Sequence, residues 1–279
     1  MKGLQHVGAS LAAFLACAGA LQAQTLITIS DYAPNTITAI NTNTLVVTTA
    51  GSVTGTVNNA AFAFGDLTWD SANNQIYMIM GYGDNNLYTL NPTTGVATLV
   101  GSHGVPDLFG LAYDAINNTL YAATFFSPYA LYSLDPNTGA ATLVGSTGVA
   151  LGSLAFNPGT GQLLGLNDGP GNLYQLNLLT GAATLLASPG STNDSGLVYD
   201  PTRNVYWAAD ASGNLFQYDP NNGYARTTVL TGLHENDGLV FIGIPEPDTL
   251  GLLAAGLALV GLGWLRRSHA RSWRGAGQA

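Results

Sequence analysis

Positive charge is scarce in this sequence. Only 8% of its 279 residues are charged, and seven lysines and arginines stand against sixteen acidic residues. Between Gln24 and Ile244 there is no lysine, and Arg203 and Arg226 stand against fourteen acidic residues. A segment this acidic lacks the basic patches that attract phosphate backbones and anionic lipids. We therefore expect neither nucleic acid nor an anionic membrane surface as a partner of this segment.

Cysteine and the common catalytic motifs are also missing. Cys17 is the single cysteine, so no disulfide can form within the chain and stability must come from packing. There is no Gly-x-Ser-x-Gly nucleophile motif, and the glycine-rich stretch Gly165–Gly171 lacks the lysine of a phosphate-binding loop. Nucleophilic catalysis therefore has no support. Two carboxylates that converge from distant segments, as in glycosidases, leave no sequence signature and stay open as an alternative.

What the sequence does contain is a repeat. A leucine is followed two residues later by an aromatic residue, and the copies of this motif are spaced 42 to 44 residues apart. The copies begin at Leu67, Leu111, Leu154, Leu197 and Leu239, and the last is cut short. A near-constant period in this range is typical of the four-stranded blades of a β-propeller.

Each copy predicts four short strands separated by turns. In the copy that begins at Leu111, the strands are Leu111–Tyr113, Leu120–Thr124, Ala130–Leu134 and Ala141–Val144. The first turn starts with Asp or Asn, at Asp70, Asp114, Asn157 and Asp200. The third turn also starts with Asp or Asn and has Gly four residues later, in Asn91–Gly95, Asp135–Gly139, Asn177–Gly181 and Asp219–Gly223. These residues favour tight turns, because Asx side chains bond the nearby backbone and Gly adopts positive φ.

The two ends of the repeat region complement each other. Residues 25–51 match only the last three strands of a blade, at Leu26–Ser30, Thr36–Asn41 and Leu45–Thr49. The missing first strand is found in Leu239–Ile242, at the other end. We therefore predict an all-β fold, a β-propeller of five four-stranded blades in residues 24–244, closed by a composite blade. Ser52–Phe64 is expected to be a surface loop.

The first 23 residues are expected to be a secretory signal peptide. Lys2 supplies the positive charge, Val7–Leu21 the apolar core, and Ala23 the small residue after which cleavage is predicted. Ala18–Ala20 is an alternative cleavage site. A retained membrane helix and a lipoprotein anchored at Cys17 are the two other interpretations, and the short Gly- and Ala-rich run fits them less well.

The composition changes abruptly after Ile244. Pro245-Glu246-Pro247 precedes the apolar run Thr249–Leu265, which as a helix would be ~25 Å long, just enough to span a bilayer. Arg266 and Arg267 follow, and they would hold the basic tail 268–279 in the cytoplasm. Together with the signal peptide, this transmembrane helix places the propeller outside the inner membrane.

The order of these C-terminal parts resembles the PEP-CTERM sorting signal of Gram-negative bacteria. The matching residues in 245–267 are Pro245, Glu246, Pro247, the Gly- and Leu-rich apolar run, and the pair Arg266-Arg267. The resemblance implies recognition by an exosortase, a membrane protease, after a transient stay in the inner membrane. It also implies export to the cell surface or to an exopolysaccharide matrix. A plain tail anchor is the alternative.

The connections from one copy to the next carry most of the distinctive polar residues, and all should lie on one face of the ring. Among them Asp66, Asp194 and Asp237 are candidate ligands for Ca²⁺, because hard cations prefer carboxylate oxygens. Solvated loop acids are the alternative explanation, and no other cofactor is expected. His103 and His234 form a weaker candidate metal pair, since neither lies in a known metal-binding spacing.

Function follows less directly from the sequence than fold does. We expect an exported propeller with a binding or structural role at the cell surface or in the matrix, with exopolysaccharide as a candidate partner. The aromatic residues Tyr82, Phe125, Phe126 and Tyr129 are expected at the rim, where they could stack on a glycan. The alternative is a secreted propeller enzyme acting on carbohydrate or lactone, for which no catalytic residue stands out.

The sorting signal generates a prediction about the mature protein. Exported protein should lack Thr249–Ala279, and replacing Pro245-Glu246-Pro247 by three alanines should leave a longer, membrane-bound form whose propeller still folds. The reason is that prolines cannot join a regular helix, so the segment stays extended for a protease. Mass spectrometry of extracellular protein decides this: a C-terminus at Ala279 on exported material would indicate a simple anchor instead.

Overall fold

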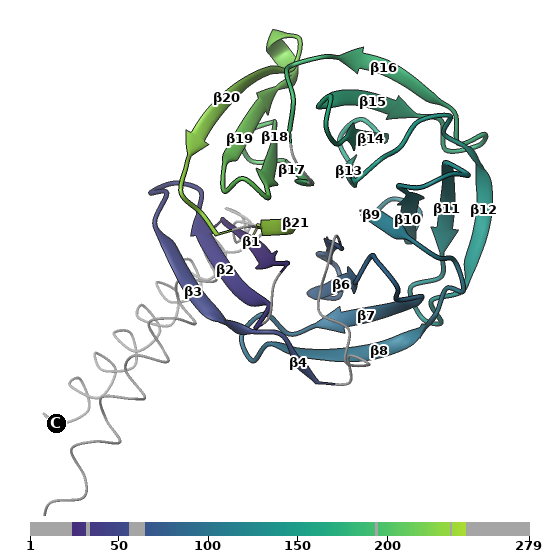
Figure 1. Ribbon diagram of the computed structural model, residues 1–279, viewed down its shortest axis with the longest axis horizontal. Helices are drawn as coiled ribbons and strands as arrows, with labels where there is room; N and C mark the ends of the chain where they lie inside the picture. The colour runs from purple at the N-terminus through teal and green to yellow at the C-terminus, as the bar shows by residue number, and fades with distance from the viewer. Residues whose placement is uncertain (1–23, 32–33, 56–64, 193–194, 235, 244–279) are drawn as a thin grey trace, which may run out of the picture. The chain divides into compact units, whose positions relative to one another are not determined.

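The strands form five sheets around one axis (Figure 1). The computed structural model describes residues 24–31, 34–55, 65–192, 195–234 and 236–243. The predicted signal peptide, membrane helix and C-terminal tail lie outside this range. Among the described residues, no helix has the length and apolar character needed to cross a membrane. The predicted five-bladed, all-β propeller is confirmed.

The first blade is built from both ends of the propeller. Its innermost strand is β21 (Asn236–Ile242), followed by β1 (Thr25–Ser30), β2 (Thr36–Asn41) and β3 (Val47–Ser52). Strands β21 and β1 are antiparallel, with Leu26 opposite Phe241. The predicted composite closing blade is therefore confirmed.

The other four blades are continuous in sequence, and their strands have the following bounds. The second blade contains β5 (Asp66–Asp70), β6 (Gln75–Ile79), β7 (Asn86–Leu90) and β8 (Val96–Ser102). The third contains β9 (Leu108–Asp114), β10 (Thr119–Thr124), β11 (Ala130–Leu134) and β12 (Ala141–Ser146). The fourth contains β13 (Ser153–Asn157), β14 (Gln162–Asn167), β15 (Asn172–Leu176) and β16 (Ala183–Ala187). The fifth contains β17 (Ser195–Asp200), β18 (Val205–Asp210), β19 (Leu215–Asp219), the 3₁₀ turn Pro220–Asn222 and β20 (Ala225–Leu230).

Strand β3 begins two residues later than predicted. Leu45, expected to open the strand, has φ 58 and instead closes the preceding turn, where its N–H donates to Asn41 O at 2.8 Å. This is the position that Gly95 and Gly139 fill in the next two blades, also with positive φ. Sequence reasoning missed the turn because leucine rarely adopts this backbone conformation.

The segment after β3 is only partly a loop. Strand β4 (Thr54–Gly55) pairs in parallel with the start of β8, which adds a fifth strand to the edge of the second blade. Residues 56–64, the rest of the predicted loop, lie outside the described part of the chain. The described part of this segment therefore connects the first blade to the outer edge of the second.

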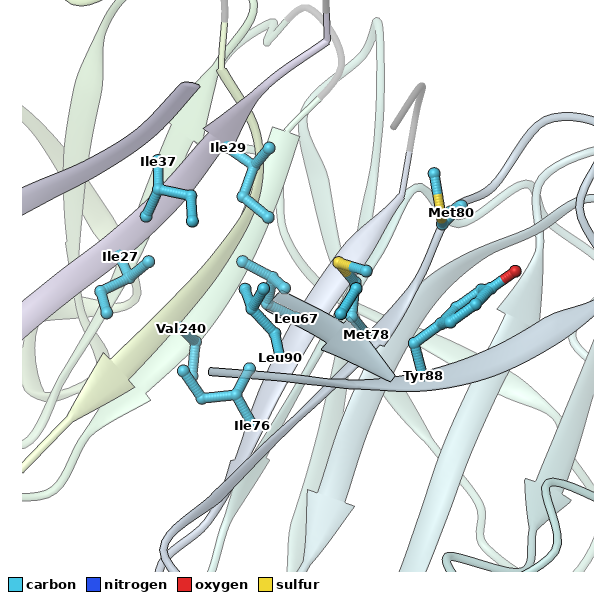
Figure 2. Packing of buried hydrophobic residues seen from close by; sticks show 11 residues of the cluster. Ile27, Ile29, Ile37, Leu67, Ile76, Met78, Met80, Tyr88, Leu90 and Val240 are labelled. Atoms are coloured by element: carbon cyan, nitrogen blue, oxygen red, sulfur yellow. The ribbon is translucent and has the colours of Figure 1, made fainter. Parts of the chain in front are cut away.

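Apolar side chains fill the spaces between neighbouring blades. Figure 2 shows one such cluster, in which Ile27 and Val240 of the composite blade meet Leu67, Ile76 and Met78 of the second blade. All five are at most 2% exposed. Four similar clusters join the remaining pairs of neighbours. Both faces of each blade are thus covered, as expected of a propeller.

Glycines let the outer strands approach the next blade closely. A Cβ atom added at Gly101, near the end of β8, would overlap the carbonyl oxygen of Thr138 in the turn before β12. Gly145 of β12 approaches Thr180 of the following blade in the same way. The end of one outer strand therefore packs on the turn that begins the next, and the outer strands follow one another around the ring (Figure 1).

The composite blade generates a prediction about stability. A recombinant propeller that ends at Gly238 should unfold, while one that ends at Gly243 should fold, because the shorter version lacks the buried residues Leu239, Val240 and Phe241. Burial of three such side chains contributes about 5–9 kcal/mol, which is similar to the roughly 5–15 kcal/mol that stabilises a whole domain. Circular dichroism during heating is the measurement. Similar melting temperatures for the two versions would contradict a closing role for β21.

Candidate functional site

Asp66 lies at the centre of the ring and is fully buried. Its Oδ1 accepts hydrogen bonds from the backbone N–H groups of Leu67 at 2.8 Å and Leu239 at 3.4 Å. Its Oδ2 accepts from the N–H groups of Leu111 at 2.9 Å and Leu154 at 3.4 Å. One carboxylate therefore joins the inner strands of four blades.

The other copies of the repeat have small residues where the second blade has Asp66. These residues are Gly110, Ser153, Gly196 and Gly238. A Cβ at Gly110 would come within 2.9 Å of Leu154, and one at Gly196 would overlap the backbone of Leu239. The inner strands therefore approach closely at these glycines, and the pattern of one Asp among small residues is a signal visible in the sequence.

The surroundings of Asp66 bear on the predicted calcium site. Burial raises the pKa of Asp66 well above its usual range, and the four N–H donors oppose this rise by stabilising the ionised form. Both oxygens already accept backbone hydrogen bonds, so a cation would compete with these donors. Asp237 is also buried, and its Oδ1 accepts from the N–H of Gly238 at 3.0 Å.

The third candidate ligand, Asp194, lies outside the described residues. Within the described part of the chain, no group of three or more His, Cys, Asp or Glu side chains is placed to hold a metal ion. A calcium site that includes Asp194 stays a prediction. His103 is buried, and burial lowers its pKa to about 4, so its ring is neutral at neutral pH. Its Nδ1 accepts from the N–H of Val105 at 3.3 Å.

Four aromatic rings gather where the second and third blades meet. Phe125 stacks on Phe109, with ring centroids 5.2 Å apart, and Phe126 meets both rings edge-on at 5.2 and 5.6 Å. Tyr82 of the second blade completes the group, 6.4 Å from Phe126. We name Tyr82, Phe109, Phe125 and Phe126 the aromatic platform. Tyr82 and Phe126 are 61% and 45% exposed, so the platform presents ring surface to solvent.

Polar contacts hold the two loops that carry the platform. The loop of Tyr82 is fixed by Asp84, whose Oδ2 accepts from the hydroxyl of Tyr88 at 2.8 Å. In the other loop, the hydroxyl of Thr124 donates to Pro128 O at 2.8 Å and accepts from the N–H of Ala130 at 2.9 Å. The rings are therefore displayed on loops anchored to buried strands, which keeps the platform preorganised.

Three of the four aromatic residues predicted at the rim lie together in the structure. Tyr82, Phe125 and Phe126 were predicted at the rim and come together, whereas Tyr129 is 37% exposed and joins none of the ring pairs. Sequence reasoning missed Phe109, which is buried beneath the exposed rings at the start of β9. Its aromatic character, one residue before the small residue at the axis, was the only available signal.

The two arginines of the propeller are both engaged in contacts between segments. Nη1 of Arg203 donates to Asp200 at 2.8 Å and to Thr42 of the composite blade at 2.9 Å. Nη1 of Arg226 donates to the carbonyl groups of Gly190 and Ser191 at 2.9 and 2.7 Å. Both guanidinium groups are therefore engaged in contacts within the propeller, and the described residues contain no other Lys or Arg.

This fold defines the protein as a five-bladed β-propeller. Its sequence matches the family model described as "Repeat of unknown function (DUF6923)" over residues 20–196, and the chain belongs to this family. A second model, the PEP-CTERM protein-sorting motif, matches residues 243–267. The PEP-CTERM sorting signal predicted at 245–267 is thus confirmed. The individual roles of Pro245, Glu246, Pro247, Arg266 and Arg267 stay predictions, and these residues lie outside the described structure. The motif implies exosortase-dependent export through a transient membrane anchor.

Other comparisons support the fold alone. A chain in the crystal structure of a nidogen/laminin complex has a TM-score of 0.53 and 11% identity, and the alignment covers 77% of this chain and 80% of that one. A structural genomics protein of unknown function from Bacteroides thetaiotaomicron VPI-5482 has a TM-score of 0.57 and 14% identity, with 80% and 63% covered. No curated protein matches the sequence.

The contacts of Asp66 generate a prediction. Asp66→Asn should lower the free energy of unfolding by about 2–4 kcal/mol, because the amide NH₂ would face backbone donors that then lack an acceptor. Urea unfolding measures the change. Asp219→Asn is the matched control: Asp219 accepts from Asn221 N–H at 2.8 Å in an exposed turn, where Asn91 and Asn177 do the same in other blades. Equal stabilities for Asp66→Asn and wild type would contradict the role of Asp66 at the axis.

Proposed function

We propose that the exported propeller binds polysaccharide at the cell surface or in the extracellular matrix, and that the aromatic platform is its binding surface. The observation that carries this proposal is the exposed pair Tyr82 and Phe126, supported by Phe125 and the buried Phe109. A pyranose ring has an apolar face of C–H groups, which packs favourably on an aromatic ring. Rings from two blades offer adjacent surfaces to successive sugar units.

The charge of the propeller supports a neutral polysaccharide as the ligand. The described residues contain two arginines, and both are engaged in contacts within the propeller. An acidic polysaccharide would approach a propeller segment with fourteen acidic and two basic residues, and the repulsion from this net negative charge would weaken binding. A neutral chain that relies on ring stacking avoids this cost.

The arrangement of carboxylates favours binding over catalysis. Acid–base catalysis needs a carboxyl group that faces the substrate. Asp66 instead accepts four backbone hydrogen bonds at the axis, and Asp84 accepts from Tyr88 beneath the platform loop. These carboxylates have structural partners, which supports a binding or scaffolding role over the alternative of a carbohydrate-active enzyme.

The platform can be tested by substitution. Phe126→Ala and Tyr82→Ala should each weaken binding to the neutral exopolysaccharide of the producing bacterium by about tenfold, the equivalent of about 1.4 kcal/mol, since each removes one exposed stacking surface. Affinity electrophoresis in gels that contain the polysaccharide measures this. Leu179→Ala is the control, because Leu179 is 89% exposed and lies in the turn between β15 and β16 of another blade. The proposal would be contradicted if Phe126→Ala and Tyr82→Ala were retarded by the polysaccharide gel as strongly as Leu179→Ala.

A further inference from the structure

A cavity of about 600 Å³ lies where the composite blade meets the second blade. Trp69 of β5 and Ile242 of β21 form part of its wall, and both pack against the apolar cluster between these blades. The remaining wall includes Asn74 in the turn before β6 and Asn91 in the turn after β7. The cavity is at the opposite end of β6 from the loop that carries Tyr82, so it is separate from the aromatic platform.

The repeat is broken at the same place. In the four continuous blades, Asp70, Asp114, Asn157 and Asp200 end the first strand. Each begins a turn into the second strand, as when Asp70 Oδ1 accepts from Ala72 N–H at 2.9 Å. The equivalent residue of the composite blade is Ile242, where the repeat ends. The sequence therefore has no Asp or Asn to begin such a turn at this position.

At the next interface, where the turn after Asp70 is present, the residue equivalent to Trp69 is more deeply buried. Tyr113 is the equivalent of Trp69 in the third blade, and its N–H donates to Thr68 of the second blade at 2.9 Å. Its ring lies 6.4 Å from that of Tyr77, and burial together with nearby Asp70 raises its pKa to about 12. Tyr113 is only 8% exposed, whereas Trp69 is half-buried. Tyr199 is half-buried too, but its hydroxyl donates to Asn204 at 2.8 Å.

The polar groups around the cavity are available to a ligand. The indole N–H of the other tryptophan of the propeller, Trp207, donates to Asp200 at 3.2 Å. No hydrogen bond from the indole of Trp69 or from the side chains of Asn74 and Thr89 is found among the described residues. The cavity thus offers an indole, an amide and a hydroxyl without competing partners in this part of the chain.

We propose that this cavity is a second ligand site, and that it binds a neutral saccharide. None of its lining residues is charged, so neither an anion nor a cation would find a counter-charge there. A sugar matches the wall, because its C–H face can pack on Trp69 while its hydroxyl groups exchange hydrogen bonds with Asn74 and Thr89. The volume lies within the roughly 300–1,000 Å³ of small-molecule sites.

The two sites together would connect polysaccharide chains. A propeller that held one glycan on the platform and another in the cavity would bridge them, which suits a matrix component. The existence of the cavity site does not depend on the platform; only its assignment to a matrix polysaccharide rests on the proposed function. The two sites are also distinguishable by spectroscopy, since the platform contains no tryptophan and the cavity contains Trp69.

Tryptophan fluorescence tests the cavity site. The full chain, in a detergent without a sugar headgroup, is titrated with cellohexaose, maltohexaose and a mannohexaose. At least one of these neutral probes should change the tryptophan emission of the wild-type protein, and the change should saturate as the probe concentration rises. The change should disappear in Trp69→Phe, which keeps an aromatic wall but removes the reporter, and it should persist in Phe126→Ala.

A pair of equivalent substitutions provides the control. Asn74→Gly should weaken the affinity measured by this titration about tenfold. Glycine fits the backbone at this position, because Asn74 has φ 51 and the equivalent residue of the fourth blade, Gly161, has φ 69. Asn118→Gly, the same change in the third blade, should leave the affinity unchanged. Absence of any saturable change with all three probes, or equal effects of both Gly variants, would overturn the site. Failure of the platform alone would show as normal gel retardation of Phe126→Ala with the fluorescence response intact.

Discussion

The propeller depends on satisfying backbone N–H groups where five inner strands converge on one axis. These groups lie away from water, and a buried N–H without an acceptor is costly. The carboxylate of Asp66 is the acceptor for one such group in each of four blades. These are the N–H groups of Leu67, Leu111, Leu154 and Leu239. The leucines that mark the repeat are thus also the residues whose backbones meet at the centre. Gly110 and Gly196, at the equivalent positions of two other copies, let the neighbouring inner strands approach closely.

Ring closure from both termini has consequences beyond stability. It places β21 beside β1 and completes the apolar packing on both sides of the composite blade. It also ends the repeat at Ile242, where every other blade has the Asp or Asn that begins a turn. The symmetry of the ring is broken at one interface, and the cavity beside Trp69 lies at that interface. The second ligand site that we propose therefore lies at the place where the repeat ends.

Two regions of different physical character follow from this architecture. The aromatic platform uses exposed rings on anchored loops, and the cavity uses a half-buried indole with uncharged polar neighbours. Both suit neutral, hydroxyl-rich ligands, and neither requires the basic residues that the propeller lacks. The PEP-CTERM motif implies exosortase-dependent export through a transient membrane anchor.

The sequence by itself determined the fold class, the five blades, the composite closure and the sorting signal. Period, turn residues and the order of the C-terminal parts are local properties of the chain, so they can be read without coordinates. The strand start predicted from the sequence at Leu45 was wrong, because this leucine takes a backbone conformation that glycine usually adopts. Only the tertiary structure decided that Asp66 accepts hydrogen bonds from four blades, that Phe109 supports Phe125 and Phe126, and that Trp69 faces a cavity. The physical reason is that each of these features joins residues from different strands or blades, and the distances between them are set by packing around the ring rather than by neighbours in sequence.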